Sequence, residues 1–313
     1  MQEQIMPYPP KQPSGKDGKK RPGVVVILLV IIALLLAVII ALLYKGSSQP
    51  PTVVESPATS ATQDDTWVAR LNAWADEFQI PEKDLPHDKA ALLTLRELDL
   101  DRDDSPLPKI TWLPAEIGQL QQLQILNLNH NQLSTLPAEI WQLQQLEAFG
   151  LRNNQLTSLP PAIGKLKQLE ILELSYNRLA TLPPEIGQLQ QLQILYLWGN
   201  QLSTLPPEIG QLQQLQDIVL IDNQLSILPP AIWQLQQLQK LYLGGNKLST
   251  LPPEIGQLQQ LQKLHLKNNQ FSSLPDEITQ LRQLEYLDIR DNPRLRLTPE
   301  QEQFLRGVEN VNR

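Results

Sequence analysis

The chain has 313 residues, a formal net charge of -7 and no cysteine, with 41% hydrophobic and 19% charged residues. The absence of cysteine excludes disulfide bonds, thiol nucleophiles and cysteine-based zinc sites. The acidic balance argues against a general nucleic-acid-binding protein, so we expect no nucleic acid among the partners.

The N-terminal part of the chain divides into two segments. Residues 1–23 are rich in proline, glycine and lysine, and we expect a basic, disordered tail because such a composition cannot build a hydrophobic core. Residues 24–44 are 21 consecutive apolar or aromatic residues without a charge, glycine or proline. Since a helix of about 20 residues crosses the hydrocarbon core of a bilayer, this run predicts one transmembrane helix in contact with lipid.

Two other interpretations of residues 24–44 are open at this point, a buried core helix and a cleaved signal peptide. A core helix of this length normally has a polar face. The apolar region of a signal peptide is usually about 7–15 residues long and ends in small residues. This run is longer and leads into Lys45 and Gly46, so an uncleaved anchor fits it better.

Flanking charges predict the orientation of this helix. After the helix, up to Asp65, Lys45 is the single basic residue, whereas five basic residues precede it: Lys11, Lys16, Lys19, Lys20 and Arg21. Lysine and arginine are enriched on the cytoplasmic side. We therefore expect a single-pass protein with a cytoplasmic N-terminus and an extracytoplasmic repeat domain, periplasmic if the source is Gram-negative. Residues 45–63, rich in Ser, Thr and Pro, predict a solvated linker.

Residues 64–94 predict a helical cap. Four apolar side chains stand at helical spacing, namely Trp67, Leu71, Trp74 and Phe78. A second short helix is expected over residues 88–93. Because the end of a stacked array would otherwise expose its core, we expect these side chains to seal the first repeat.

Residues 95–297 consist of units 23 residues long. An irregular first copy begins at Leu95, so we expect about nine repeats. Eight regular copies of the form LPxEIGQLQQLQxLxLxxNQLST begin at Leu113, Leu136, Leu159, Leu182, Leu205, Leu228, Leu251 and Leu274. The LxL alternation places both leucines on one face of a short strand. One unit cannot bury these leucines alone, so neighbouring units must stack with parallel strands.

Two further features recur among the regular copies. The LPxEI segment predicts a short helical turn on the outer side, since proline suits a first helical turn and glutamate suits its positive end. The asparagine of NQL can donate and accept hydrogen bonds, so a column of asparagines can satisfy the turn backbone of successive repeats. A ligand-binding ladder of amides is the alternative, and we favour the structural role.

Residues 298–313 predict the C-terminal cap. The segment Thr298-Pro299-Glu300-Gln301 is typical of a helix start. We expect this helix to place Phe304 and Leu305 over the last repeat.

The array resembles the leucine-rich repeat family, in its 23-residue class with an LPxxI motif. The resemblance covers Leu95 to Leu297 and rests on the eight in-phase copies. It implies an α/β solenoid, curved, with a parallel β-sheet on the concave face and helical end caps. It also implies protein binding, the usual role of known members. The uniform repeats and simple architecture are similar to those of bacterial members.

No catalytic constellation stands out in the sequence. The histidines His130 and His265 lie six repeats apart, too far to share a metal ion, and each glycine of the GQL motif stands alone rather than in a phosphate-binding loop. We therefore expect no enzymatic activity, no metal and no cofactor.

The positions that vary between repeats lie beside the LxL leucines, on the predicted concave face. The centre of this face is apolar and aromatic, with Ile171, Tyr176, Ile194, Tyr196, Trp198, Val219, Ile221 and Tyr242. It is flanked by the acidic residues Glu147, Glu170 and Glu173, and on the other side by Lys240, Lys263, His265, Lys267 and Arg290. Clustered Tyr and Trp on an exposed sheet are typical of interfaces, so we expect a protein partner with a hydrophobic ridge and split polarity.

Other interpretations stay open. Tyr and Val also favour strands for their shape alone. If the aromatic patch is exposed, replacing Trp198 and Tyr196 by alanine should abolish partner capture and leave thermal stability nearly unchanged. A regulatory or signalling subunit acting through a membrane partner, or cell-wall glycan binding by ring stacking, are alternative functions. Finally, Trp141 and Trp233 replace the glycine of IGQL in two repeats; they either form a second contact surface or cover glutamine side chains, and we favour the second role.

Overall fold

The computed structural model of the chain describes residues 66–103 and 105–313. The expected tail, transmembrane helix and linker lie outside the described residues. Within the described part, no helix combines the length and the apolar character that crossing a membrane requires.

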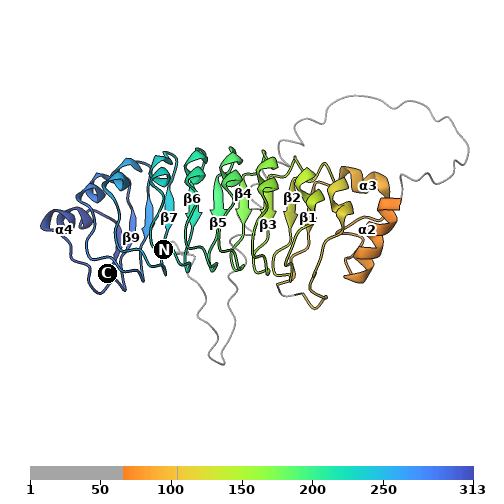
Figure 1. Cartoon of the computed structure of the whole chain (residues 1–313), viewed down its shortest axis with the longest axis horizontal. Coiled ribbons are helices and arrows are strands. Elements are labelled where there is room, and N and C mark those ends of the chain that lie inside the picture. Colours follow the sequence, from red (N-terminus) through yellow and green to blue (C-terminus); the bar gives the residue numbers. More distant parts are fainter. Residues whose placement is uncertain (1–65, 104) are drawn as a thin grey trace, which may run out of the picture. The chain divides into compact units, whose positions relative to one another are not determined.

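The described chain forms one parallel ten-stranded sheet in which each strand lies beside its neighbours in sequence (Figure 1). Each strand has three residues, and most pair with the strand 23 residues further on, as Ile171 does with Ile194. The strands are β1 (Glu97–Asp99), β2 (Ile125–Asn127), β3 (Ala148–Gly150), β4 (Ile171–Glu173), β5 (Ile194–Tyr196), β6 (Asp217–Val219), β7 (Lys240–Tyr242), β8 (Lys263–His265), β9 (Tyr286–Asp288) and β10 (Asn310–Asn312). The predicted parallel repeat sheet is confirmed.

The predicted outer turns are 3-10 helices. A proline with extended backbone precedes each one, and the leucine that follows donates its backbone N–H to the isoleucine carbonyl, as Leu189 does to Ile186. These helices are η2 (Ala115–Gln119), η3 (Ala138–Gln142), η4 (Pro161–Lys165), η5 (Pro184–Gln188), η6 (Pro207–Gln211), η7 (Pro230–Gln234), η8 (Pro253–Gln257) and η9 (Asp276–Gln280). The proline before each 3-10 helix favours a turn, which agrees with the short length of these helices.

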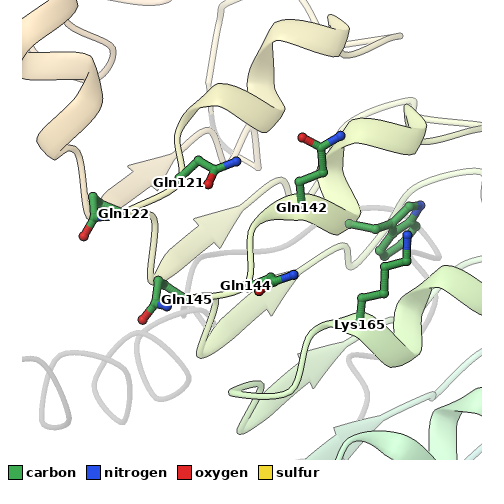
Figure 2. A pocket seen from close by; sticks show the side chains of 7 residues that line it. Gln121, Gln122, Gln142, Gln144, Gln145 and Lys165 are labelled. Carbon is green, nitrogen blue, oxygen red and sulfur yellow. The ribbon is translucent and has the colours of Figure 1, made fainter.

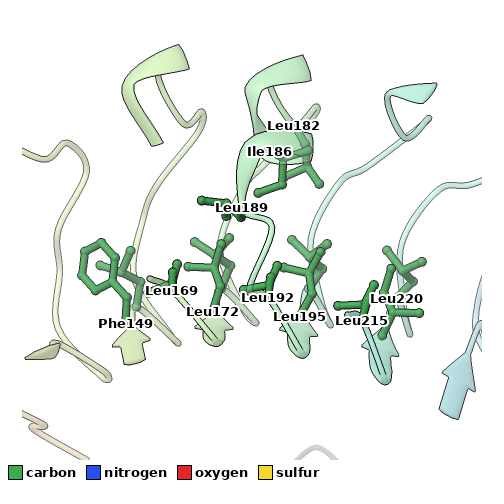
Figure 3. Close-up of a cluster of buried hydrophobic side chains, with 14 of the residues drawn as sticks. Phe149, Leu169, Leu172, Leu182, Ile186, Leu189, Leu192, Leu195, Leu215 and Leu220 are labelled. Atoms are coloured by element: carbon green, nitrogen blue, oxygen red, sulfur yellow. The ribbon is translucent and has the colours of Figure 1, made fainter. Parts of the chain in front are cut away.

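The core lies between the sheet and the 3-10 helices. Figure 3 shows leucines of successive repeats stacked in register, among them Leu172 and Leu195, which are fully buried. Burying one such side chain contributes about 1.5–3 kcal/mol relative to leaving it exposed. Because each leucine packs against those of the next unit, this contribution depends on stacking.

The asparagine column has the structural role that we favoured. The Asn200 Nδ2 donates to the carbonyl oxygens of Leu174, in the preceding repeat, at 3.0 Å and of Leu197 at 3.1 Å. Its Oδ1 accepts the backbone N–H of Leu179 at 3.0 Å. The other repeat asparagines make the same bonds, so each amide joins two neighbouring units.

Helices cap both ends. At the N-terminal end, α2 (Thr66–Glu77) buries Leu71 and Trp74, and α3 (Lys89–Thr94) begins one residue later than expected because Asp88 is its N-cap. Phe78, just after α2, is also buried, whereas Trp67 is only half-buried.

At the C-terminal end, α4 (Pro299–Leu305) begins with a capping box in which Thr298 and Gln301 exchange hydrogen bonds. Leu305 is buried and Phe304 half-buried. The tenth strand, β10, was not predicted. It pairs with β9 and covers that edge of the sheet.

Candidate functional site

The thirteen side chains expected to bind a partner gather over five neighbouring repeats. Strand pairing aligns them in rows on the sheet face turned away from the leucine core, which we call the open face. One row pairs Ile171, Ile194, Asp217, Lys240 and Lys263, and the next pairs Glu173, Tyr196, Val219, Tyr242 and His265. Trp198, Ile221 and Lys267 follow two residues after their strands, and Tyr176 lies in a turn with φ of 56°.

The centre of the open face is a second hydrophobic cluster, separate from the leucine core. Trp198, Ile221 and Tyr242 are only 8%, 7% and 5% exposed, and Tyr176 and Val219 pack against them. We expected the aromatic and apolar side chains of this face to form an exposed patch. That expectation is wrong for Trp198, Ile221 and Tyr242. They cover one another, because strands in adjacent repeats bring large side chains within contact distance.

Four side chains form a continuous series across this cluster. The Arg152 guanidinium lies 5.0 Å from the centre of the Tyr176 ring. The Tyr176 and Trp198 rings are 4.7 Å apart between centroids. The Trp198 Nε1 donates to the Asp222 carboxylate at 3.0 Å. We call Arg152, Tyr176, Trp198 and Asp222 the aromatic series; it links four successive repeats and holds its rings in one arrangement.

A glycine makes room for this series. Gly199 has a φ of +66°, and a Cβ there would lie 2.8 Å from the Tyr176 ring. Glycine is thus required both by its backbone conformation and by the close approach of the ring. Sequence reasoning did not include Arg152 or Asp222 in the site, since neither is apolar and their contacts reach across repeats.

The acidic flank differs in burial. Glu147 and Glu170 are exposed, whereas Glu173 is buried and accepts the Ser175 backbone N–H at 2.7 Å. Burial raises the pKa of the Glu173 carboxyl, although hydrogen bonds from Ser175 act in the opposite direction. Partial desolvation also raises the pKa of the Glu147 carboxyl, although its side chain is exposed, and the nearby charge of Glu170 adds to the effect. Burial likewise raises the pKa of the Tyr176 phenol to about 12.

The basic flank is partly neutralised by carboxylates. Lys240 Nζ lies 2.7 Å from Asp217, and Lys267 Nζ lies 3.5 Å from Asp291. Lys263 has no ion pair with any residue that the structure describes, so it contributes the least compensated positive charge of the flank.

At the C-terminal end of the basic flank, one buried carboxylate contacts two basic side chains. Asp288, fully buried, receives two hydrogen bonds from the Arg290 guanidinium, at 2.9 and 2.6 Å. The His265 Nε2 lies 3.3 Å from the same carboxylate. Arg290 and His265 are therefore held in place on the open face rather than free to follow a ligand.

The open face has properties that are common in recognition surfaces. Tyr, Trp and Arg side chains are fixed by mutual contacts, and charges of opposite sign flank them. In the part of the chain that the structure covers, no group of three His, Asp or Glu side chains is placed to hold a metal ion.

Sequence models identify the repeats directly. A model described as "Leucine rich repeat" matches residues 144–201, 190–248 and 236–293, and a second model of the same description matches residues 122–143. No curated protein matches the chain.

Solved structures are similar over the array. A leucine-rich repeat protein of Leptospira interrogans is 34% identical over 69% of this chain and 72% of its own, with a TM-score of 0.42. A TDR receptor is 28% identical over 70% of this chain and 40% of its own, with a TM-score of 0.60.

A third structure is the ectodomain of the Arabidopsis thaliana membrane receptor kinase GASSHO1/SCHENGEN3, in complex with CASPARIAN STRIP INTEGRITY FACTOR 2. It is 28% identical over 70% of this chain and 33% of its own, with a TM-score of 0.55. The chain thus spans about a third to two fifths of the two receptor structures.

Proposed function

We propose that this chain, which belongs to the leucine-rich repeat family, binds a protein ligand on its open face and is anchored in a membrane by residues 24–44. The observation that carries the proposal is the aromatic series, in which Arg152, Tyr176 and Trp198 are held by contacts across repeats. Tyr, Trp and Arg are the side chains that most often dominate binding energy at protein interfaces.

Rigidity of this series favours binding. An interface side chain that is immobilised only on binding costs about 0.5–1.5 kcal/mol of entropy. The nearly buried Trp198 holds the half-buried Tyr176 ring in the free protein, so a ligand that packs on Tyr176 avoids most of this cost. Tyr196, half-buried beside them, offers apolar area at the centre of the face.

One similar structure supports a ligand-binding role. The plant receptor ectodomain was solved in complex with CASPARIAN STRIP INTEGRITY FACTOR 2, and its fold aligns with 70% of this chain. By analogy with that complex, we propose a protein partner for this chain. Opposite charges on the two flanks would orient it, with basic groups toward Glu147 and Glu170 and acidic groups toward Lys263.

The membrane anchor is proposed from residues 24–44 alone, because their length and apolar character suit a bilayer. The five basic residues before them favour a cytoplasmic N-terminus and an extracytoplasmic array. A reporter fused after Arg313 that is active only outside the cytoplasm tests this arrangement. An active reporter is expected, and an inactive one alongside an active cytoplasmic reporter would contradict the orientation.

Co-purification tests the ligand. The full-length chain, tagged after Arg313, is solubilised from its native membrane and its bound proteins are compared between variants. Tyr196→Ala with Lys263→Ala should lose a partner that the unaltered chain retains. The matched control, Gln191→Ala with Gln214→Ala on the exposed outer side, should keep it. Loss of the partner with the control and retention with Tyr196→Ala would overturn the proposal.

A further inference from the structure

The outer side of the array carries a second feature that the open face does not explain. In most repeats a glycine stands inside the 3-10 helix and touches the next repeat. A Cβ on Gly187 would lie 2.5 Å from the Glu208 carbonyl oxygen, and one on Gly118 would lie 2.6 Å from that of Glu139. The absence of a side chain therefore sets how closely neighbouring 3-10 helices pack.

Trp141 occupies this glycine position in η3, and Trp233 does so in η7. Both indoles are 2% exposed, and the Trp141 ring meets Phe149 edge-on at 6.5 Å. They are thus inserted between repeats, and the alternative of a second contact surface is wrong, since a buried ring is not a contact surface. Trp141 does lie beside glutamine side chains, because it lines one cleft with Gln142 and Gln144. The 3-10 helices that follow, η4 and η8, pack less closely against η3 and η7 than η5 does against η4.

This separation leaves a cleft beside Trp141. Its volume is about 400 Å³, and it is polar and open to solvent. Figure 2 shows its glutamine side chains and Lys165 arranged around the opening. The lining residues are Gln121, Gln122, Trp141, Gln142, Gln144, Gln145 and Lys165.

Within the described residues, the amides of this cleft other than that of Gln121 are available to a ligand, whereas Gln121 Nε2 donates to the Gly118 carbonyl at 3.3 Å. In repeats with glycine, the corresponding glutamine donates to the glycine carbonyl, as Gln190 does to Gly187 and Gln213 to Gly210, both at 2.6 Å. Gln144 stands at the same position, but its side chain makes no hydrogen bond within the described residues. The same holds for the side chains of Gln142 and Gln145.

We propose that this cleft binds a sugar that carries a carboxylate, such as a uronic acid unit. Each carboxamide both donates and accepts, which matches the neighbouring hydroxyl groups of a sugar ring. Lys165 is exposed and has no ion pair among residues 66–103 and 105–313, and its ammonium group is a donor only, which matches a carboxylate. The site lies on the outer side and is independent of the protein ligand proposed for the open face.

The chain contains its own comparison. Around Trp233 the same positions hold the same residues with one exception, because Gln257 stands where Lys165 stands beside Trp141. The second position therefore has the amides without the positive charge. Lys165→Gln removes the positive charge beside Trp141, and Gln257→Lys adds one beside Trp233. Both lysine and glutamine already occur at this position of the repeat.

Calorimetric titration of the full-length chain in detergent tests the proposal, with trigalacturonate and triglucuronate as probes and their methyl esters as uncharged controls. We expect saturable binding of at least one acid, weakened about tenfold or more by esterification or by Lys165→Gln, since charge-assisted hydrogen bonds are the stronger ones. Trp141→Gly should abolish binding by closing the cleft. Gln257→Lys should raise the number of bound sugars toward two.

Three results would contradict the proposed sugar site. Binding that is unchanged by Lys165→Gln, equal binding of the methyl esters, or no saturable binding of either acid would overturn the proposal. Thermal melting of each variant verifies that it is folded. None of these results bears on partner capture by the open face.

Discussion

The Trp198 indole donates a hydrogen bond to the Asp222 carboxylate across two successive repeats, with 3.0 Å between Nε1 and Oδ2. Trp198 is 8% exposed, although it lies on the sheet face turned away from the leucine core. The open face thus has a small core of its own. Side chains that hold the partly exposed Tyr176 ring in place also stabilise the array, so binding and folding depend on shared residues.

Replacing Trp198 tests this shared role. Trp198→Ala should lower the free energy of unfolding by about 3 kcal/mol, because it removes a packed aromatic ring. Trp198→Phe keeps most of the packing but removes the hydrogen bond, so a loss of about 1 kcal/mol is expected. Urea denaturation followed by circular dichroism measures both. The expected loss replaces the earlier expectation that alanine at Trp198 and Tyr196 leaves thermal stability nearly unchanged. An unaltered denaturation midpoint for Trp198→Ala would contradict the second hydrophobic cluster on the open face.

The asparagine column predicts a large effect from one amide. Asn200→Ala leaves the N–H of Leu179 without its partner, whereas the carbonyl oxygens of Leu174 and Leu197 each keep one bond, from Asn177 and Asn223. Since a buried unsatisfied group costs about 1–3 kcal/mol, a loss of about 1–3 kcal/mol is expected after relaxation. Denaturation midpoints are compared with those of Gln201→Ala, an exposed neighbour. Equal midpoints would show that the amide does not join the repeats.

Glu173 predicts a specific pH dependence of stability. Burial raises the pKa of its carboxyl in the folded chain above the value of about 4.3 expected when unfolded. Between these two values the folded chain binds more protons, so the free energy of unfolding falls as pH rises and the penalty is complete above the folded-state pKa. Glu173→Gln should therefore be more stable than the unaltered chain at pH 7.

Denaturation of both proteins between pH 3 and 8 measures this difference, which should vanish below about pH 4, where both states of Glu173 are protonated. The other acidic groups are common to both proteins and cancel in the comparison. A variant that is less stable at pH 7 would mean that the hydrogen bonds from Ser175 outweigh the cost of burial.

The C-terminal capping box predicts a local effect. Thr298→Ala removes the hydroxyl that accepts the Gln301 N–H at the start of α4, and a loss of about 1 kcal/mol is expected. Thr298→Ser keeps the hydroxyl and serves as the control. Hydrogen exchange should accelerate at β10 and β9 before it does at β5. Uniform acceleration along the array would show that the cap acts on the whole fold.

Much of this fold could be predicted because one pattern recurs eight times. The leucine spacing determines strand, turn and core together, and the asparagine follows from the chemistry of its amide. The tenth strand could not be found this way, because Asn310, Val311 and Asn312 lack the repeat leucines that identify the other strands.

The candidate site was only partly predictable. Alternation placed Tyr196, Val219 and Tyr242 on the open face, but it could not show how far each side chain reaches over the next repeat. That depends on Gly199 making room for Tyr176 and on Asp222 accepting from Trp198. The burial of Trp141 could not be predicted either, because the sequence around it does not indicate whether the ring points outward or inserts between repeats.

Photocrosslinking from the open face in the native membrane tests the central claim most directly. A photoreactive phenylalanine analogue replaces Tyr196 in the full-length chain, and the same analogue replaces Gln191, on the outer side of the same repeat, as the control. The account predicts a discrete crosslinked protein from position 196 that is absent from position 191. A crosslinked protein from position 191 alone, or none from position 196 with the chain folded and in the membrane, would contradict it.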